Sequence, residues 1–232
     1  MNIVIPAAGA GSRFKTFYTY PKPYIKVDDM SMIVLAVKTL DIKGTYHYIL
    51  PADDLTAAVK QELEQLTPDC YFYVINYVTE GAVQTALLAE DYIDNDVELI
   101  ITNCDQVMHW DSADILKDLR RHDAGLVTIQ NTDPKHSYAL VENSKVTTVV
   151  EKKVISTNAL TGIHYWKQGK DFVNSGKQMI NDNNRSLNEF YISGTYNYLI
   201  SDGLSVGAAE IQNDEISFIG TPEDLERYNA SK

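Results

Sequence analysis

The first 27 residues combine glycines and positive charge in a way that suits a polyphosphate. Residues 9–13 read Gly-Ala-Gly-Ser-Arg directly after the apolar run Asn2–Pro6, and Lys22 follows within a Pro-Lys-Pro triplet. This stretch holds four cations and no carboxylate, in a chain whose formal net charge is -12. Because Gly9 and Gly11 can adopt positive φ and lack a Cβ, their amides can approach a phosphate or a base. We therefore expect this segment to bind a triphosphate.

The glycine spacing alone leaves a second interpretation open, namely a tight turn from a strand into a helix. A dinucleotide-binding fingerprint would need a third glycine where Phe14 stands, and a P-loop would need a closing Gly-Lys-Ser/Thr. Arg13 and Lys22 are what favour phosphate binding over a simple turn.

A carboxylate follows another apolar run, in the segment Leu-Ile-Ile-Thr-Asn-Cys-Asp at residues 99–105. An aspartate at the carboxyl end of a strand can bind Mg²⁺ and bring it to a phosphate, because hard divalent ions prefer carboxylate and phosphate oxygens. The alternative is that Asp105 caps the next turn. Cys104 is expected to be a small packed residue.

Several motifs together resemble the NTP:sugar-1-phosphate nucleotidyltransferases. The opening signature of that family is Ala-Ala-Gly-x-Gly-x-Arg followed about ten residues later by Pro-Lys-Pro, and residues 7–13 and 21–23 carry both halves. Further matches follow in the family's order: residues 76–86, which include Thr-Glu-Gly-Ala, then Asp105, the Glu151-Lys152 pair, and residues 188–195. The resemblance implies an enzyme that joins an NTP to a phosphorylated acceptor and releases pyrophosphate.

The resemblance also implies roles for individual residues. Arg13 would grip the triphosphate, Lys22 would neutralise charge near the α-phosphate, and Asp105 would bind the Mg²⁺ cofactor. The implied nucleotide-binding residues are Ala7, Ala8, Gly9, Gly11, Asn76, Glu80 and Gly81. The implied acceptor-binding residues are Lys152, Gly162, Tyr165, Glu189 and Tyr191, with Lys153 as the alternative to Lys152. Taken alone, Asn76 is equally typical of a turn, and Lys152 of a solvated edge strand.

Substrate identity is less sharply indicated. The Thr-Glu-Gly-Ala form resembles a subgroup involved in capsular and related surface polymers, including phosphoglutamine-type cytidylyltransferases, which favours CTP over UTP or dTTP. The acceptor is a sugar 1-phosphate or a small non-sugar phosphate. Many family members place a second metal-binding aspartate where this chain has Phe218. Either Glu189 or Glu210 completes the metal site, or Asp105 acts with phosphates and waters alone.

Two other classes of function remain as alternatives. A non-catalytic nucleotide-binding or regulatory module is compatible with the missing second acid. A glycosyltransferase that uses nucleotide sugars usually has an Asp-x-Asp pair, whereas residues 103–105 contain one acid.

The elements that must position these residues alternate between strands and helices through the first half of the chain. This alternation predicts an α/β protein with a three-layer, Rossmann-like, mostly parallel sheet, whose ligands bind at the carboxyl ends of the strands. Expected strands are Asn2–Pro6, Tyr46–Leu50, Tyr71–Asn76, Glu98–Thr102 and Leu126–Gln130, then Tyr138–Glu142 and Val146–Glu151 in a small antiparallel insertion, and Val206–Ile211 and Ile216–Ile219. Expected helices are Met32–Leu40, Leu55–Leu66, Val83–Ala89, Ser112–Arg121, Gln168–Ile180, Leu187–Ser201 and one that Thr221 caps.

Length and composition place these elements in one domain, residues 1–232, with an NTP-binding core at 1–130 and an acceptor-binding part at 131–232.

The acidic balance argues against a nucleic-acid partner, because nucleic-acid binders use a broad basic face. Met1 leads directly into a strand and no apolar run approaches the roughly 20 residues that span a bilayer, so we expect no membrane association and a cytoplasmic protein. Two cysteines fit a reducing compartment. A homo-oligomer is compatible with the sequence, which does not fix the oligomeric state.

Overall fold

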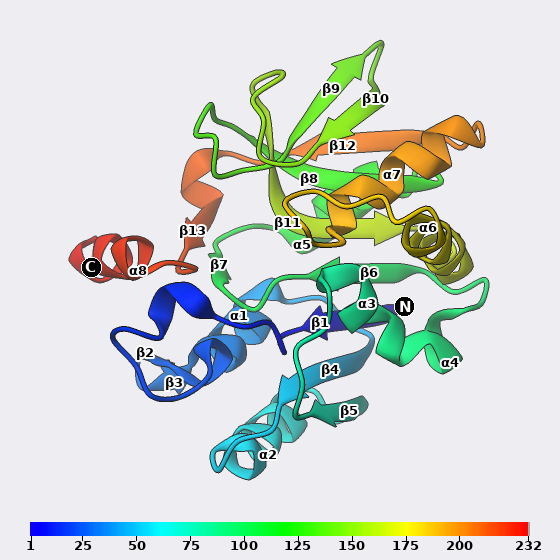
Figure 1. Cartoon of the computed structure of the whole chain (residues 1–232). Coiled ribbons are helices and arrows are strands. Elements are labelled where there is room, and N and C mark those ends of the chain that lie inside the picture. Colours follow the sequence, from blue (N-terminus) through cyan, green and yellow to red (C-terminus); the bar gives the residue numbers. More distant parts are fainter. Residues whose placement is uncertain (232) are drawn as a thin grey trace.

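The computed structural model describes residues 1–231, which contain a nine-stranded sheet with helices on both faces (Figure 1). Its main path runs β10-β9-β11-β6-β1-β4-β5, and β8 and β12 extend the sheet beside β11. The strands of this sheet are β1 (Asn2–Pro6), β4 (Thr45–Pro51), β5 (Cys70–Ile75), β6 (Leu99–Thr102), β8 (Ala124–Gln130), β9 (Tyr138–Glu142), β10 (Lys145–Val150), β11 (Asn158–Trp166) and β12 (Val206–Glu210). Two small antiparallel pairs lie outside this sheet, one of β2 (Lys26–Val27) with β3 (Met30–Ser31) and one of β7 (Gln106–Met108) with β13 (Ile216–Phe218).

The first part of the chain forms the parallel half of the sheet. Strand β1 lies between β4 and β6 and pairs in parallel with both, and β4 pairs in parallel with β5. Its residues Ile3, Val4 and Ile5 are fully buried, as a continuous apolar run at the centre of a parallel sheet requires. The carboxyl ends of β1, β4 and β6 consequently meet at one edge.

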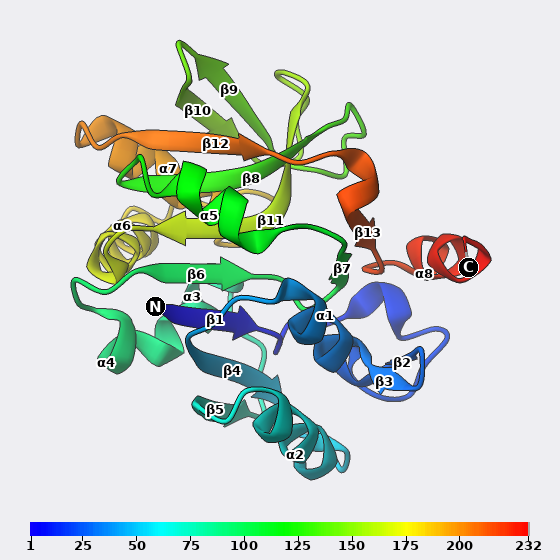
Figure 2. The ribbon, with the colours of Figure 1, turned by 180° about the vertical axis from the view of Figure 1, so that it is seen from behind.

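Helices cover the two faces of the sheet, and each face has its own apolar core. One core packs α1 (Met32–Leu40), α2 (Thr56–Leu66) and α5 (Ser112–Leu119) against the sheet, on the side seen in Figure 2. The other packs α3 (Ala82–Ala86), α4 (Glu90–Ile93), α6 (Gly169–Asn181) and α7 (Ile192–Ser201). The predicted three-layer α/β architecture is therefore confirmed.

A third, smaller apolar cluster lies beneath the glycine loop. Phe14 and Ile25 pack there with Leu225 of α8 (Pro222–Ala230). Thr221 caps α8 as expected, since its hydroxyl accepts a hydrogen bond of 3.1 Å from the amide of Asp224. The last helix thus packs onto the loop that opens the chain.

Strand β11 joins the two parts of the chain and runs antiparallel to its neighbours. Its end, from Ile163 on, pairs with β6, whereas its start, at Ala159, pairs with β9. Both β6 and β9 lie on the side of β11 opposite β8, so the two strands part beside residues 160–162. This opening in the sheet makes room for a cavity.

The helix expected at Leu187–Ser201 begins five residues later, at Ile192. Leu187 and Asn188 have φ values of 49° and 66°, and Ser186 forms a bridge with Glu189. Left-handed residues cannot continue a helix, so this prediction was wrong at its start. The helix expected at Val83–Ala89 is α3 followed by a 3₁₀ turn at Leu87–Ala89. No helix within residues 1–231 is long and apolar enough to cross a membrane.

Candidate functional site

The glycine loop and the end of β6 meet through an ion pair. Nζ of Lys22 donates to Oδ2 of Asp105 at 2.7 Å, and both side chains are mostly buried. Gly11 permits this approach because its φ is 57° and a Cβ there would lie 3.1 Å from Cβ of Lys22. Gly220 closes the other side of Asp105, where a Cβ would lie 2.5 Å from Oδ2. The two charged residues are therefore held by close backbone packing.

Lys22 stays charged in this setting. Burial lowers the pKa of Lys22, but the Asp105 carboxylate beside it raises that pKa, and the net shift is above the ordinary value for a lysine. The pair consequently offers a fixed ammonium group that a phosphate can approach.

A cavity of about 350 Å³ lies on one side of this ion pair, between the glycine loop and the ends of β4 and β5. Four of the predicted nucleotide-binding residues line it, namely Ala8, Gly9, Gly11 and Asn76, and Lys22 lines it as well. Ala7 lies beneath the loop and is buried, and its amide donates to the carbonyl of Ile49. Sequence reasoning missed the tyrosines of this cavity, Tyr18, Tyr20 and Tyr77, although aromatic residues near a base-binding loop are a usable signal.

The other two predicted nucleotide-binding residues lie outside this cavity. Gly81 is the N-cap of α3 with φ 142°, and a Cβ there would lie 2.4 Å from the amide nitrogen of Phe190. Glu80 is exposed, and its Oε2 accepts a hydrogen bond of 3.0 Å from Arg185. The structure thus packs this turn against the segment that leads into α7.

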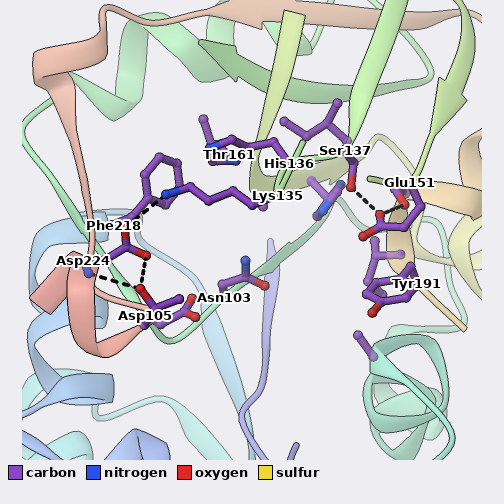
Figure 3. Close-up of a pocket in the computed structure, with 18 of the residues that line it drawn as sticks. Asn103, Asp105, Lys135, His136, Ser137, Glu151, Thr161, Tyr191, Phe218 and Asp224 are labelled. Carbon is purple, nitrogen blue, oxygen red and sulfur yellow. Dashed lines mark hydrogen bonds and ion pairs between the residues drawn. The ribbon is translucent and has the colours of Figure 1, made fainter. Parts of the chain in front are cut away.

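A second cavity, of about 270 Å³, lies on the other side of the ion pair, where β6 and β9 part. Figure 3 shows Lys135, Phe218 and Asp224 at one end, Ser137, Glu151 and Tyr191 at the other, and Asn103 between them. The predicted residues that line it are Arg13, Asp105, Gly162 and Tyr191. Asp105 therefore faces the second cavity while its partner Lys22 faces the first.

Gly162 is necessary where β11 crosses this cavity. Its φ is 89°, which L side chains rarely adopt, and a Cβ there would lie 2.1 Å from Nδ2 of Asn103, so that the side chain of Asn103 would have to shift. The side-chain amide of Asn103 fills that space and lines the cavity.

The predicted acceptor lysine, Lys152, does not itself line the second cavity, but it contacts Tyr191, which does. Nζ of Lys152 donates to the hydroxyl of Tyr191 at 2.8 Å and lies 4.5 Å from the centre of its ring. The adjacent Glu151 is buried, and its carboxylate accepts hydrogen bonds from the hydroxyls of Ser137 and Ser193. Sequence reasoning did not name Glu151 as a site residue, although the Glu-Lys pair pointed to it.

Besides Lys152, two more predicted acceptor-binding residues do not line this cavity. Tyr165 is buried and its hydroxyl donates to Glu98 at 2.8 Å, away from both cavities. Glu189 is exposed, and its backbone is bonded to that of Ser186. Glu210, the other acid considered for a metal, accepts from Gln130 at 2.6 Å and lines neither cavity.

The acids that do line the second cavity are Asp105, Glu151 and Asp224. Asp224 is buried and already paired, with Nζ of Lys135 at 3.1 Å and Nη1 of Arg227 at 3.4 Å. Within residues 1–231, no group of three or more His, Cys, Asp or Glu side chains could hold a metal ion by itself. The protein alone therefore supplies one carboxylate, Asp105, near the junction of the cavities.

Neither a family model nor a curated protein matches the sequence. Among solved structures, the nucleoside-diphosphate-sugar pyrophosphorylase from Vibrio cholerae RC9 is similar with a TM-score of 0.86 and 25% identity, covering 97% of this chain and 98% of that one.

Two further solved structures share the fold. A putative glucose-1-phosphate thymidylyltransferase from Bacillus anthracis has a TM-score of 0.78 at 23% identity, covering 99% of this chain and 94% of the other. The inositol-1-phosphate CTP transferase from T. maritima has a TM-score of 0.74 at 17% identity, covering 98% of this chain and 93% of the other. All three likenesses confirm the predicted fold, and the likeness to the pyrophosphorylase also confirms the resemblance to the nucleotidyltransferases.

Proposed function

We propose that this protein is a nucleotidyltransferase that joins an NTP to a small phosphorylated acceptor and releases pyrophosphate. The observation that carries the proposal is the ion pair between Lys22 and Asp105 at the junction of two cavities. The glycine-loop cavity would hold the nucleotide, and the cavity at the opening of the sheet would hold the acceptor. A reaction between two phosphorylated substrates needs such a charged junction.

In the proposed reaction an oxygen of the acceptor phosphate attacks the α-phosphorus of the NTP. A new phosphorus–oxygen bond forms, the bond from the α-phosphorus to the bridging oxygen breaks, and pyrophosphate leaves. The acceptor phosphate is already anionic near pH 7, so no side chain has to remove a proton. The protein's contribution is in-line positioning and neutralisation of charge, as is usual in phosphoryl transfer.

Lys22 and Arg13 are the cations closest to that chemistry. Lys22 is held beside the glycine loop by Asp105, and Arg13 lines the acceptor cavity from the same loop. Lys152 donates a hydrogen bond to Tyr191, and Tyr191 lines the far end of the acceptor cavity. In this arrangement Lys152 would attract the acceptor phosphate and reduce its repulsion from the triphosphate.

Asp105 fits a Mg²⁺ ion that arrives with the triphosphate. Mg²⁺ usually keeps several waters and binds through one or two carboxylates plus substrate phosphates, and one carboxylate is what Asp105 supplies. The bound ion would add positive charge at the α-phosphate. Phe218 lines the cavity where many family members have a second aspartate, so the proposed site relies on Asp105.

CTP is the proposed donor, and the acceptor is a sugar 1-phosphate or a small non-sugar phosphate. The Thr-Glu-Gly-Ala sequence at residues 79–82 supports CTP, and the names of the pyrophosphorylase, thymidylyltransferase and CTP-transferase structures support this substrate range.

A matrix of the common NTPs against phosphorylated acceptors, with Mg²⁺ present and pyrophosphate release as readout, tests the proposal. Release that requires both substrates supports it. Nucleotide binding without release over the whole matrix would instead indicate a regulatory module.

A further inference from the structure

His136 carries an unpaired polar atom in the acceptor cavity. Its side chain is 8% exposed, and Nε2 has no hydrogen-bond partner. Among residues 1–231, only three buried side-chain atoms lack a partner, and the other two belong to Gln106 and Trp166, which do not line the cavity. Buried polar atoms in proteins are normally paired, so Nε2 is the one place in this cavity where a partner is missing.

The remaining contacts of His136 indicate what that partner must be. The backbone of Leu160 acts on the imidazole in the direction that raises its pKa, but this effect is the smallest of those on the ring. Burial, followed by the nearby charge of Lys135, holds the pKa of His136 below its ordinary value, so the ring is neutral near pH 7. A neutral imidazole has one nitrogen that donates a hydrogen bond and one that accepts, so the unpaired Nε2 can accept a hydrogen bond from a ligand.

The surroundings of His136 favour a neutral partner. The ring of Phe218 lies 5.0 Å away, centre to centre, and covers the imidazole with an apolar surface. Asp224 already pairs with Lys135 and Arg227. A cationic group of a ligand would therefore meet these two positive charges and find no unpaired carboxylate at this end of the cavity. An anionic group would face the lone pair of Nε2. A hydroxyl group, which is neutral and donates, fits both conditions.

We propose that Nε2 of His136 accepts a hydrogen bond from a hydroxyl group of the acceptor, which makes His136 a residue that selects among phosphorylated acceptors. This inference rests on the proposed function. The subsite lies at the Lys135 and Asp224 end of the cavity, opposite Glu151 and Tyr191 (Figure 3). An acceptor that reaches it must carry a hydroxyl at some distance from the reacting phosphate.

The test compares wild type with H136F, which removes the accepting nitrogen, and H136Q, whose side-chain oxygen can accept at a similar position. H109F is the matched control, because His109 lies outside both cavities and bonds Ser217. Glucose 1-phosphate, its 2-, 3-, 4- and 6-deoxy forms and inositol 1-phosphate serve as probes, with CTP, UTP and dTTP as donors.

For the best hydroxyl-bearing acceptor, H136F should raise the acceptor KM about 10-fold, the value of one hydrogen bond, with the KM for the NTP and kcat unchanged. The acceptor KM of H136Q and of H109F should stay within about 3-fold of the wild-type value. Wild type should also discriminate against one deoxy form, and H136F should lose that discrimination. An unchanged acceptor KM in H136F, or an equal rise in the KM for the NTP, would overturn the proposal.

Two outcomes need separate treatment. If thermal melting shows that H136F is unfolded, the deoxy series on wild type and H136Q decides, and equal use of every deoxy form contradicts the proposal. If no substrate pair releases pyrophosphate, the proposed function has failed, and calorimetric binding of the same sugar phosphates tests the subsite directly. Weaker binding by H136F than by wild type supports it, whereas equal binding or none overturns it.

Discussion

Nζ of Lys22 lies 2.7 Å from Oδ2 of Asp105, although the two residues are 83 positions apart in the chain. They meet because Lys22 follows the loop after β1 and Asp105 follows β6, and β1 and β6 are parallel neighbours. Each residue faces a different cavity, so the pair connects the proposed nucleotide and acceptor sites.

Removing either charge of this pair should nearly abolish pyrophosphate release. Loss of one charge from a desolvated phosphoryl-transfer site lowers the rate on the order of 10²-fold or more. The rate of pyrophosphate release by K22A and by D105A should therefore fall by at least that factor. K38A, which removes an exposed cation on α1, is the control and should be unaffected. Turnover close to that of wild type in K22A or D105A, measured on folded protein, would contradict the assignment.

Gly81 should be much less tolerant of alanine than Gly203. Both have positive φ, 142° and 82°, but a Cβ at Gly203 meets open space whereas one at Gly81 meets the backbone of Phe190. We expect G203A to lower the free energy of unfolding by about 1 kcal/mol and G81A by about 3 kcal/mol or more. Urea unfolding of the two variants measures the difference, and equal losses would show that the contact with Phe190 is not rigid.

Lys152, and not Lys153, should bind the acceptor. Lys152 is anchored by Tyr191 at 2.8 Å, so K152A should raise the acceptor KM about 10-fold or more while the KM for the NTP stays unchanged. Y191F removes the anchoring hydroxyl but keeps the ring beside the ammonium group, so we expect the acceptor KM to rise about 3-fold. Steady-state kinetics measures these KM values, with K153A as the matched variant. A larger rise in the acceptor KM for K153A than for K152A would reverse the assignment.

Stability should fall as the pH drops below about 6.5. Burial lowers the pKa of His164 to about 3, and burial lowers the pKa of His47 to about 4. The unfolded chain therefore binds more protons than the folded one between the folded values and 6.5, and stability is lost as pH falls through this window. Each histidine contributes a slope of about 1.4 kcal/mol per pH unit there.

Urea unfolding between pH 4 and 7 measures this slope. H164F should reduce the slope of the free energy of unfolding against pH by the contribution of one histidine. H109F should leave the slope unchanged, because His109 is exposed. A slope that is the same in H164F and wild type would contradict the role of His164.

Much of the parallel half of the fold was predictable, because strong local patterns coincide with the tertiary structure there. The strand Asn2–Pro6 and the helix Met32–Leu40 have the predicted boundaries, since one is a continuous apolar run and the other a buried helix. The meeting of Lys22 and Asp105 also follows from parallel pairing, which brings the carboxyl ends of strands to one edge.

The acceptor side was less predictable, because its geometry depends on contacts that local sequence does not encode. Tyr165 turns away from the cavity because its neighbour His164 lines it and successive residues of a strand face opposite sides, but local sequence does not show which face of β11 meets the cavity. Glu189 stays outside because left-handed residues delay the start of α7. His136 was missed because one histidine in a loop carries no signal until the cavity around it is known.

The most direct test of the account follows the reaction of CTP with Mg²⁺ and a phosphorylated acceptor by ³¹P NMR. The account predicts that pyrophosphate and a pyrophosphate-linked nucleotide product appear in equal amounts, only when both substrates are present, and that K22A forms neither. Pyrophosphate that appears without acceptor, or nucleotide that binds and is never converted with any acceptor, would contradict it.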